Sequence, residues 1–386
     1  MQYNTKKNRL TIVVLKEMSD KKTVAVGMSG GVDSSVAAYL LHEQGYNVIG
    51  VTMQIWLDEG LYELSRADGC CSLSAVDDAE KVCDIIGIPH KVVNFRDIFR
   101  DRVIRDFIDE YAGGRTPNPC IVCNRYVKWE ALLQWSLENG ADYIATGHYA
   151  RVVRLANGRY TIQQSVTAAK DQTYALYSLT QEQLARTLMP VGEYEKPRIR
   201  RIAQDAHLPV SAKPDSEEIC FIPDNDYAGF LERELGSRTP PGGNFVSTDG
   251  RILGRHKGIT HYTIGQRRGL GLAMGHHVFV TEIRPDTNEV VIGEAADVYS
   301  SVLSCTGLNF MSVSGSDFPV GDSRRLFCKI RYRHPGEWCT VYRTAEDRLE
   351  VRFETPVRAV TPGQAAVMYD GDHIACGGTI EKRETK

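Results

Sequence analysis

Apolar and polar residues alternate in blocks along the first half of the chain. Short apolar runs that are typical of buried strands occur at residues 23–27, 48–56, 91–95 and 143–147. Segments with helical periodicity lie between these runs, at residues 36–44, 74–86 and 124–138. Strands and helices in this order predict a parallel sheet with helices on both faces. We therefore expect an α/β fold with a doubly wound parallel sheet at residues 21–222, after an N-terminal extension at residues 1–20.

The sequence changes in character after residue 222. Gly and Pro become frequent, and short alternating segments follow at residues 277–283, 289–293, 324–332 and 349–353. Evenly spaced short strands are typical of small β domains and barrels. We expect a small central β-rich domain at residues 223–296 and a C-terminal β-barrel domain at residues 297–386.

The composition is that of an ordinary globular protein with more than one domain: 386 residues, 42% hydrophobic and 25% charged. The longest apolar runs are far shorter than the ~20 residues that a membrane helix needs, so we expect no membrane partner. Ten cysteines are scattered along the chain without an export signal, which favours a reducing compartment, the cytoplasm. The net charge of −3 neither requires nor excludes a nucleic acid partner.

The strongest local signal is the sequence Gly-Met-Ser-Gly-Gly-Val-Asp-Ser at residues 27–34, between the first predicted strand and the first predicted helix. Glycines let the backbone approach phosphate oxygens, and the helix N-terminus adds partial positive charge. The loop lacks the Gly-Lys-Ser/Thr of a Walker A loop and the G-x-G-x-x-G of dinucleotide-binding folds. It resembles the loop of the ATP pyrophosphatase family, whose members cleave ATP between its α and β phosphates.

This resemblance implies an ATP site at the carboxyl edge of the predicted sheet. Pyrophosphate would lie on the loop, Asp33 would help to place Mg²⁺, and Met53 would lie against the adenine. Core packing accounts for Met53 equally well. The residues implied in ATP binding are Gly27, Met28, Ser29, Gly30, Gly31, Val32, Asp33, Ser34, Met53 and Gly147.

A second signal is a stiff loop with two prolines that leads into Cys120 and Cys123. The prolines direct Cys123 toward the start of a helix, where the reactive thiolate is favoured. The C-x-x-C pair could be half of a zinc site, but a structural zinc needs four ligands and no second pair accompanies it. A thioredoxin-type redox pair is a further alternative, although that pair normally opens the first helix of a small domain.

Cys220 follows near the end of the predicted α/β domain, between Ile219 and Phe221. A single cysteine in such surroundings is more often a buried core residue than a reactive one. The phosphate loop, the Cys pair and Cys220 nevertheless occur together, in an order that resembles the tRNA 2-thiouridylase (MnmA) family. The resemblance extends over residues 21–380 and includes the segments 147–149, 170–172, 262–271 and 331–333.

The resemblance implies an enzyme that makes 2-thiouridine at the wobble position of tRNA. ATP would adenylate the O2 oxygen of the uridine, and sulfur would replace that oxygen with release of AMP and pyrophosphate. Cys220 would carry the sulfur as a persulfide, and Cys123 would be the nucleophile that ends in a disulfide with it. A sulfur-donor protein, such as a cysteine desulfurase or a sulfur relay protein, would load Cys220. The target base would contact Asn118, Pro119 and Cys120.

Position 120 departs from the best-known form of the family, which carries Asp there. The substitution puts an acid or base role of this position in doubt. Three thiolates, those of Cys120, Cys123 and Cys220, could instead hold a [4Fe-4S] cluster with one iron open to carry sulfide. The persulfide route and the cluster route are both open at this point.

Cations are concentrated in three segments of this nearly neutral chain. Residues 251–284 hold six Arg or Lys and one acidic residue, and residues 324–343 hold the same numbers. The third cluster is Lys196, Arg198, Arg200 and Arg201. A single run is readily explained as a solvated face, but three are typical of a surface that binds a phosphate backbone. The resemblance implies tRNA contacts by His148, Lys170, Asp171, Gln172, Arg331, Tyr332 and Gln364.

Two other functions fit parts of the pattern. An ATP pyrophosphatase that adenylates and amidates a small acid would share the phosphate loop, but it needs neither the Cys pair nor a basic β region. A non-catalytic tRNA-binding module would share the basic segments, but it would not need Ser29, Asp33 and Ser34 in the loop together with Cys123 and Cys220.

Overall fold

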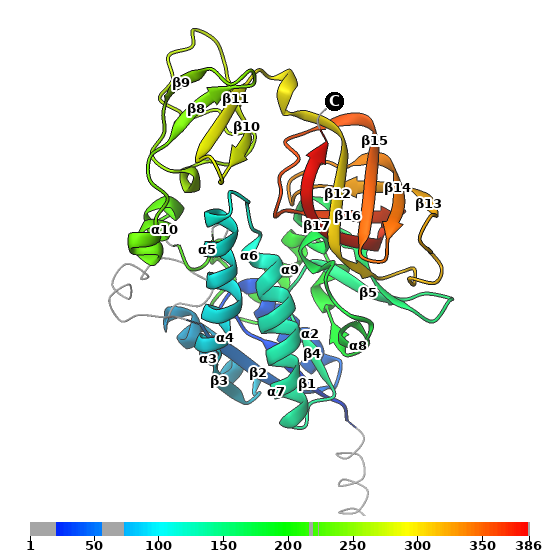
Figure 1. Cartoon of the computed structure of the whole chain (residues 1–386). Helices are drawn as coiled ribbons and strands as arrows, with labels where there is room; N and C mark the ends of the chain where they lie inside the picture. The colour runs from blue at the N-terminus through cyan, green and yellow to red at the C-terminus, as the bar shows by residue number, and fades with distance from the viewer. Residues whose placement is uncertain (1–20, 56–72, 216–218, 223, 385–386) are drawn as a thin grey trace, which may run out of the picture.

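The computed structural model describes residues 21–55, 73–215, 219–222 and 224–384. Figure 1 shows an α/β part built from the N-terminal half, a small β sheet and a barrel. The small sheet and the barrel lie next to each other on one side of the α/β part. The fold class predicted from the sequence is confirmed.

A sheet of five parallel strands forms the centre of the α/β part, in the order β3-β2-β1-β4-β7. Its strands are β1 (Thr23–Gly27), β2 (Asn47–Gln54), β3 (His90–Asn94), β4 (Tyr143–Ala145) and β7 (Thr187–Leu188). The first four agree closely with the predicted apolar runs. The sequence did not predict β7, because two residues are too few to show a period.

Helices cover both faces of this sheet. One face carries α2 (Val32–Glu43), α3 (Leu73–Ile86) and α9 (Lys196–Asp205). The other carries α4 (Arg96–Phe99), α5 (Arg105–Ala112), α6 (Pro119–Val122), α7 (Leu133–Glu138) and the π-helical segments Arg100–Ile104 and Cys123–Leu132. Two further helices are α8 (Gln181–Ala185) and α10 (Tyr227–Leu235). The strands read as continuous apolar runs because the sheet is buried on both sides.

The helix that carries the Cys pair begins at Pro119, earlier than predicted. Asn118 caps this helix, since its side chain accepts a hydrogen bond from the backbone N–H of Ile121 at 3.3 Å. Pro119 at the first helical position has a φ that already suits a helix. The helical backbone then continues from α6 into the π-helical segment that Cys123 opens. Cys120 therefore lies in the first turn, with Cys123 just beyond it.

The rest of the chain is mostly antiparallel. The central sheet has the order β10-β11-β8-β9 and consists of β8 (Asn244–Ser247), β9 (Ile252–Arg255), β10 (Phe279–Arg284) and β11 (Glu289–Gly293). The barrel consists of β12 (Tyr299–Phe310), β13 (Ser323–Lys329), β14 (Glu337–Ala345), β15 (Arg348–Arg358), β16 (Ala365–Asp370) and β17 (His373–Glu384). Pairing of β12 with β17 closes the barrel, which removes the exposed edges of an open sheet.

A hairpin of the α/β part continues the barrel sheet. Its strands, β5 (Ala150–Arg154) and β6 (Tyr160–Gln164), pair with each other, and β6 also pairs with β17. The guanidinium group of Arg159 donates to the backbone oxygens of Phe310 and Met311 at 2.7 and 2.8 Å. The barrel and the α/β part are therefore joined by strand pairing and by hydrogen bonds between side chain and backbone.

Most of the remaining cysteines fill cores. Those that are fully buried are Cys83, Cys305, Cys328, Cys339 and Cys376. Burial raises the pKa of Cys83 to about 12, so its thiol is unreactive at neutral pH. Cys70 and Cys71 lie outside the described residues. Within the described ranges, no helix combines the length and the apolar character needed to cross a lipid bilayer.

Buried His334 makes the stability of the barrel depend on pH. Its side chain is 6% exposed, and its Nδ1 accepts a hydrogen bond from the N–H of Gly336 at 3.1 Å. Burial, together with the cations of Arg331 and Lys329, lowers the pKa of His334 from 6.5 to about 4. Because unfolding restores the higher pKa, this contribution is present above pH 6.5 and is lost as the pH falls toward 4.

We expect His334→Gln to reduce the loss of stability in acid, because a Gln side chain can accept the same hydrogen bond without taking up a proton. The measurement is the free energy of unfolding in urea at about pH 7 and about pH 5 for both proteins. An equal loss in both proteins would contradict this role of His334.

Candidate active site

The loop between β1 and α2 has a defined shape. The hydroxyl of Ser34 accepts a hydrogen bond from the backbone N–H of Ser29 and donates one to the carbonyl of Gly31, both at 3.2 Å. Gly30 has a φ of +66°, and a Cβ there would lie 2.4 Å from the carbonyl oxygen of Ala75. Glycine is therefore required at this position. Gly31 is the N-cap of α2 and has no side chain to cover the first N–H groups, where an anion can bind.

Some predicted ATP residues can reach a nucleotide only through their backbone. Met28 and Val32 are 1% and 3% exposed and belong to the apolar cluster beneath α2. Met53 is partly buried near the carboxyl end of β2 and packs against the cluster on the other face of the sheet. Its place fits core packing as well as contact with an adenine.

Gly147 brings the end of β4 against the loop. A Cβ at this position would lie 2.5 Å from the backbone nitrogen of Ser34 and 2.6 Å from the carbonyl carbon of Asp33. The close approach of the two segments therefore requires glycine. In the sheet register Gly27 pairs with Val51, so the loop, the end of β2 and Gly147 share one carboxyl edge. Doubly wound sheets bind their ligands at this edge.

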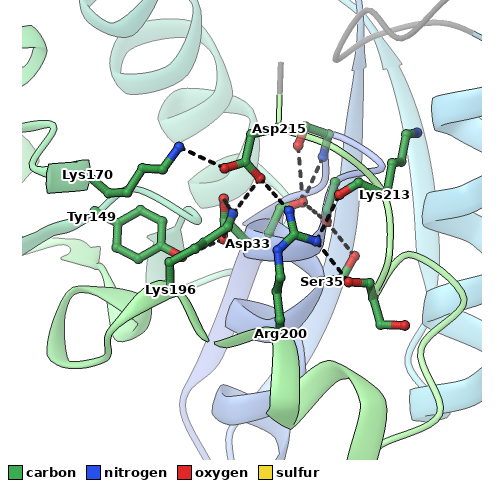
Figure 2. A network of polar contacts seen from close by, with 12 residues as sticks. Asp33, Ser35, Tyr149, Lys170, Lys196, Arg200, Lys213 and Asp215 are labelled. Carbon is green, nitrogen blue, oxygen red and sulfur yellow. Dashed lines mark hydrogen bonds and ion pairs between the residues drawn. The ribbon is translucent and has the colours of Figure 1, made fainter. Parts of the chain in front are cut away.

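Asp33 is held by two side chains from other segments (Figure 2). The Nζ of Lys196, at the start of α9, donates to both carboxylate oxygens at 2.8 Å. The hydroxyl of Tyr149 donates to Oδ1 at 2.7 Å. The Lys196 side chain is 12% exposed, so this is a mostly buried ion pair and not a surface contact.

Lys196 also binds Asp215, which precedes the segment with Cys220, at 2.7 Å. Lys170 and Arg200 bind the same carboxylate at 2.9 and 3.0 Å. Burial raises the pKa of Asp215, but the bonds to Lys196 and Lys170 outweigh it and hold the pKa below its usual value. Lys196 therefore bridges the phosphate loop and the segment that leads to Cys220.

A second lysine contacts the loop directly. The Nζ of Lys213 donates to the carbonyl of Gly30 at 3.1 Å and to the carboxylate of Asp78 at 2.8 Å. In Figure 2, Lys196 lies beside Asp33, whereas the side chain of Lys213 points away from Asp33 and Asp215 on the other side of the network. Lys196 and Arg200, two of the four cations in the third basic cluster, turn inward to carboxylates, whereas Arg198 and Arg201 are exposed.

The described residues show no preformed site for the Mg²⁺ ion or for the iron–sulfur cluster that the sequence analysis considered. Among the described residues, no group of three or more His, Cys, Asp or Glu side chains is placed to hold a metal ion. Cys120, Cys123 and Cys220 are not gathered into such a group in the described structure, and the cluster route stays a prediction. Asp33 already binds a lysine with both oxygens, so it is not a preformed Mg²⁺ site either. A Mg²⁺ ion commonly arrives with the nucleotide and is held mainly by its phosphates.

Cys123 and Cys220 border the same apolar cluster of the α/β part. Both side chains are partly exposed and pack against this cluster from outside. Phe221, next to Cys220, makes edge contacts with Phe99 and Phe107 at centroid distances of 5.7 and 5.3 Å. These rings fix the end of the segment with Cys220. Residues 216–218, ahead of it, lie outside the described residues.

The barrel holds the proline loop in front of Cys120. The side-chain amide of Gln364 donates to the carbonyls of Thr116 and Pro117 at 3.0 and 2.9 Å. The N–H of Thr116 donates to the carbonyl of Pro362 at 2.9 Å. Gln364, which the sequence proposed as a tRNA contact, thus serves at least to position this loop.

Several other proposed tRNA residues are directed into the protein. His148 shares a hydrogen bond with the hydroxyl of Thr146 at 2.8 Å, and burial lowers its pKa well below the usual value, so it is neutral. Asp171 accepts hydrogen bonds from the N–H of Ser165 and the hydroxyl of Thr173 at 3.2 and 2.6 Å. Such residues can position neighbours but are poorly placed to grip phosphate through charge.

The other proposed tRNA residues in this part of the chain are Lys170, Gln172 and Tyr332. Gln172 accepts a hydrogen bond from the N–H of Tyr149 at 2.8 Å, and Lys170 binds Asp215. Tyr332 is 41% exposed. Burial of the rest of the ring, together with the charges of Asp171 and Cys120, raises its pKa, and the ring makes an edge contact with Tyr174 at a centroid distance of 6.4 Å.

The three parts of the chain meet around a cavity of about 320 Å³. It is lined by Thr116, Thr263, Ile264, Arg331, Arg358, Ala359, Thr361 and Gln364. Arg331 is half-buried, and burial together with the charge of Arg358 lowers its pKa. Two crowded guanidinium groups make this cavity a favourable place for an anion.

Comparison with known families divides the chain into three matches. Residues 22–224 match the tRNA methyl transferase HUP domain, residues 228–294 the tRNA methyl transferase PRC-barrel domain, and residues 303–380 the aminomethyltransferase β-barrel domain. These ranges correspond to the α/β part, the central sheet and the barrel.

Curated relatives resemble the chain over nearly its whole length. The tRNA-specific 2-thiouridylase MnmA of Lachnoclostridium phytofermentans is 59% identical over 361 residues, which cover 94% of this chain and 100% of the relative. The chain belongs to the tRNA-specific 2-thiouridylase family. The family members of Clostridioides difficile and Clostridium acetobutylicum are 50% and 52% identical, and the matches cover 94% and 93% of this chain and 98% and 99% of theirs.

Membership in the 2-thiouridylase family confirms the resemblance drawn from the phosphate loop, the Cys pair and Cys220. It also explains why a phosphate loop and a basic β region occur in the same chain. An amidating enzyme does not need the basic region, and a tRNA-binding module does not need the phosphate loop.

The sequence did not predict the hydrogen bonds and ion pairs around the phosphate loop. The residues that make them are Tyr149, Lys196, Lys213 and Asp215. One signal was available: the phosphate loop contains no lysine, although phosphate loops commonly need a cation. Which distant lysines take this place could not be read from the sequence, because their approach depends on how α9 packs against α2.

We expect Gly147→Ala to weaken ATP binding by at least about tenfold, because the methyl group must push β4 away from the first turn of α2. Isothermal titration with a non-hydrolysable ATP analogue measures the change. Gly315→Ala is the control, since a Cβ there meets only the flexible guanidinium of Arg343, at 3.4 Å. Unchanged binding by the Gly147 variant would show that the close approach is not needed for the ATP site.

Proposed function

We propose that this chain is an ATP-dependent tRNA-uridine 2-sulfurtransferase that converts the wobble uridine of tRNA to 2-thiouridine. One observation carries the proposal: in a chain of the 2-thiouridylase family, a phosphate loop and two partly exposed cysteines belong to one α/β part.

ATP binds, in this proposal, with its phosphates over residues 27–34 and its adenine toward Met53. The N–H groups at the start of α2 face the pyrophosphate, and Gly147 lets β4 close the site from the other side. The O2 oxygen of the uridine attacks the α phosphate and pyrophosphate leaves. The base then carries AMP on O2, so that a poor leaving group has become a good one.

Sulfur transfer follows at the two cysteines. The terminal sulfur of a persulfide on Cys220 attacks C2 of the base, and AMP leaves with the former O2 oxygen. The thiolate of Cys123 then attacks the Cys220 sulfur, which releases the thiocarbonyl of 2-thiouridine and forms a Cys123–Cys220 disulfide. A thiol reductant supplies two electrons to regenerate both cysteines, and a sulfur-donor protein reloads Cys220. The need for this reductant suits the cytoplasm.

The target base enters beside the first turn of the Cys helix. Asn118 uses its side-chain oxygen to cap that helix, which leaves its amide N–H₂ group to donate to the base. Pro119 and Cys120 follow, and Tyr332 has an exposed ring that can stack on a flipped-out base.

The tRNA backbone lies across the central sheet and the barrel in this proposal. Exposed cations in the central sheet and its loops include Arg255, Lys257, Arg267 and Arg268. The cavity between the three parts adds Arg331 and Arg358 close to the proline loop. A phosphate held there would keep the anticodon loop near Asn118.

We expect Cys123→Ala and Cys220→Ala each to abolish 2-thiouridine formation while ATP binding persists, since neither thiol belongs to the phosphate loop. Mass spectrometry of nucleosides from digested tRNA measures the product, and isothermal titration measures ATP binding. Cys305→Ala is the matched control, because this thiol is buried in the barrel and should leave thiolation intact.

Thiolation by either of the first two variants would overturn the assigned roles. ATP turnover to AMP in the presence of a small carboxylic acid but not of tRNA would favour the amidating alternative.

An iron count on anaerobically purified protein tests the cluster route. Stoichiometric iron that is lost in Cys120→Ala would refute the persulfide route.

A further inference from the structure

The phosphate loop of this chain lacks a cation of its own. In a Walker A loop a lysine reaches the β and γ phosphates, but residues 27–35 contain no Lys or Arg and one acidic residue, Asp33. The triphosphate of ATP carries several negative charges, which backbone N–H groups and a helix N-terminus only partly balance. A Mg²⁺ ion that arrives with the nucleotide balances part of this charge, and side chains from other segments can balance the rest.

Two lysines reach the loop from the part of the chain that precedes Cys220: Lys196 at the start of α9 and Lys213 after its end. Lys196 lies on one side, with its Nζ 2.8 Å from both oxygens of Asp33. Lys213 lies at Gly30, with its Nζ 3.1 Å from the Gly30 carbonyl. Their side chains are 12% and 23% exposed, so both ammonium groups are largely withdrawn from water.

Each ammonium is paired with one carboxylate of the loop region. Lys196 binds Asp33 in the first turn of α2, and Lys213 binds Asp78 of α3 at 2.8 Å. Such pairs keep a withdrawn cation stable, and a more highly charged phosphate group can replace the carboxylate as the partner. The distances place both cations within a side-chain rotation of the loop.

We propose that Lys196 and Lys213 are the cations of the ATP phosphate site and that each exchanges its carboxylate for phosphate oxygens when ATP binds. This inference rests on the proposed function, because it assumes that the loop binds ATP. Lys196 keeps its second partner, Asp215, which Lys170 and Arg200 also hold.

A consequence concerns the sulfur-carrying segment. Asp215 precedes the segment with Cys220, so Lys196 connects phosphates on the loop with the approach to that cysteine. When ATP occupies the loop, Lys196 exchanges Asp33 for phosphate oxygens and keeps Asp215. Activation of the base by ATP is thereby coupled, in this proposal, to delivery of sulfur by Cys220.

Binding measurements without tRNA test the assignment. We expect Lys196→Met and Lys213→Met each to raise the Kd for ATP by about tenfold or more, and to raise the Kd for inorganic pyrophosphate similarly. The matched control is Lys22→Met, which breaks a lysine–aspartate pair of the same 2.8 Å length with Asp142 at the opposite end of β1. It should bind ATP like the unchanged protein.

A substitution that should tighten pyrophosphate binding distinguishes this role of Lys213 from a purely structural one. Asp78→Asn removes the carboxylate that competes for Lys213, so we expect pyrophosphate to bind several-fold more tightly. If the pair served only to support α3, the same substitution would weaken binding or leave it unchanged. Circular dichroism and the thermal midpoint establish that each variant is folded, and Asp78→Asn tests the exchange even if a lysine variant does not fold.

Three outcomes would overturn the proposal: unchanged Kd values in both lysine variants, an equal loss in Lys22→Met, or pyrophosphate binding in folded Asp78→Asn that is weaker or unchanged. They leave the proposed function intact as long as the unchanged protein binds ATP. If the unchanged protein binds no ATP, the proposed function and this inference fail together.

Discussion

The ion pairs of Lys196 join the phosphate loop to Asp215, which lies five residues ahead of Cys220. Its ammonium lies 2.8 Å from Asp33 at the start of α2 and 2.7 Å from Asp215 ahead of Cys220. A mostly buried ammonium is stable only with such partners, since removal from water is costly. The phosphate loop, the start of α9 and Asp215 therefore hold one mutual arrangement, and the remaining features of the site depend on it.

The barrel supports the proline loop ahead of the Cys helix. Gln364 donates to the carbonyls of Thr116 and Pro117, and the carbonyl of Pro362 accepts from the N–H of Thr116. These hydrogen bonds from the barrel to the backbone of the α/β part make the position of the proline loop depend on how the barrel docks. A loop that is supported from outside its own domain is more rigid than one that is not.

Motif residues that the sequence assigned to tRNA divide into two groups in the structure. His148, Asp171 and Gln172 are engaged with neighbouring protein groups, whereas Arg331 and Tyr332 face the cavity or the solvent near the Cys helix. A motif shows only that residues occur together along the chain. Whether a polar side chain meets a phosphate or a backbone N–H depends on its surroundings, which the motif does not contain.

Local patterns along the chain were enough to predict the parallel sheet and a phosphate-binding loop, because periodicity and glycine act over a few neighbouring residues. The roles expected of Cys123 and Cys220 came from the resemblance to a family, since local patterns favoured a core position for Cys220. They placed the start of the Cys helix too late, since the capping by Asn118 was not recognised. The inward turn of Lys196 to Asp33, instead of outward to RNA, became visible only in the folded chain. That pair joins residues 163 positions apart, and its formation follows from the packing of α9 on α2, a long-range contact that no local pattern encodes.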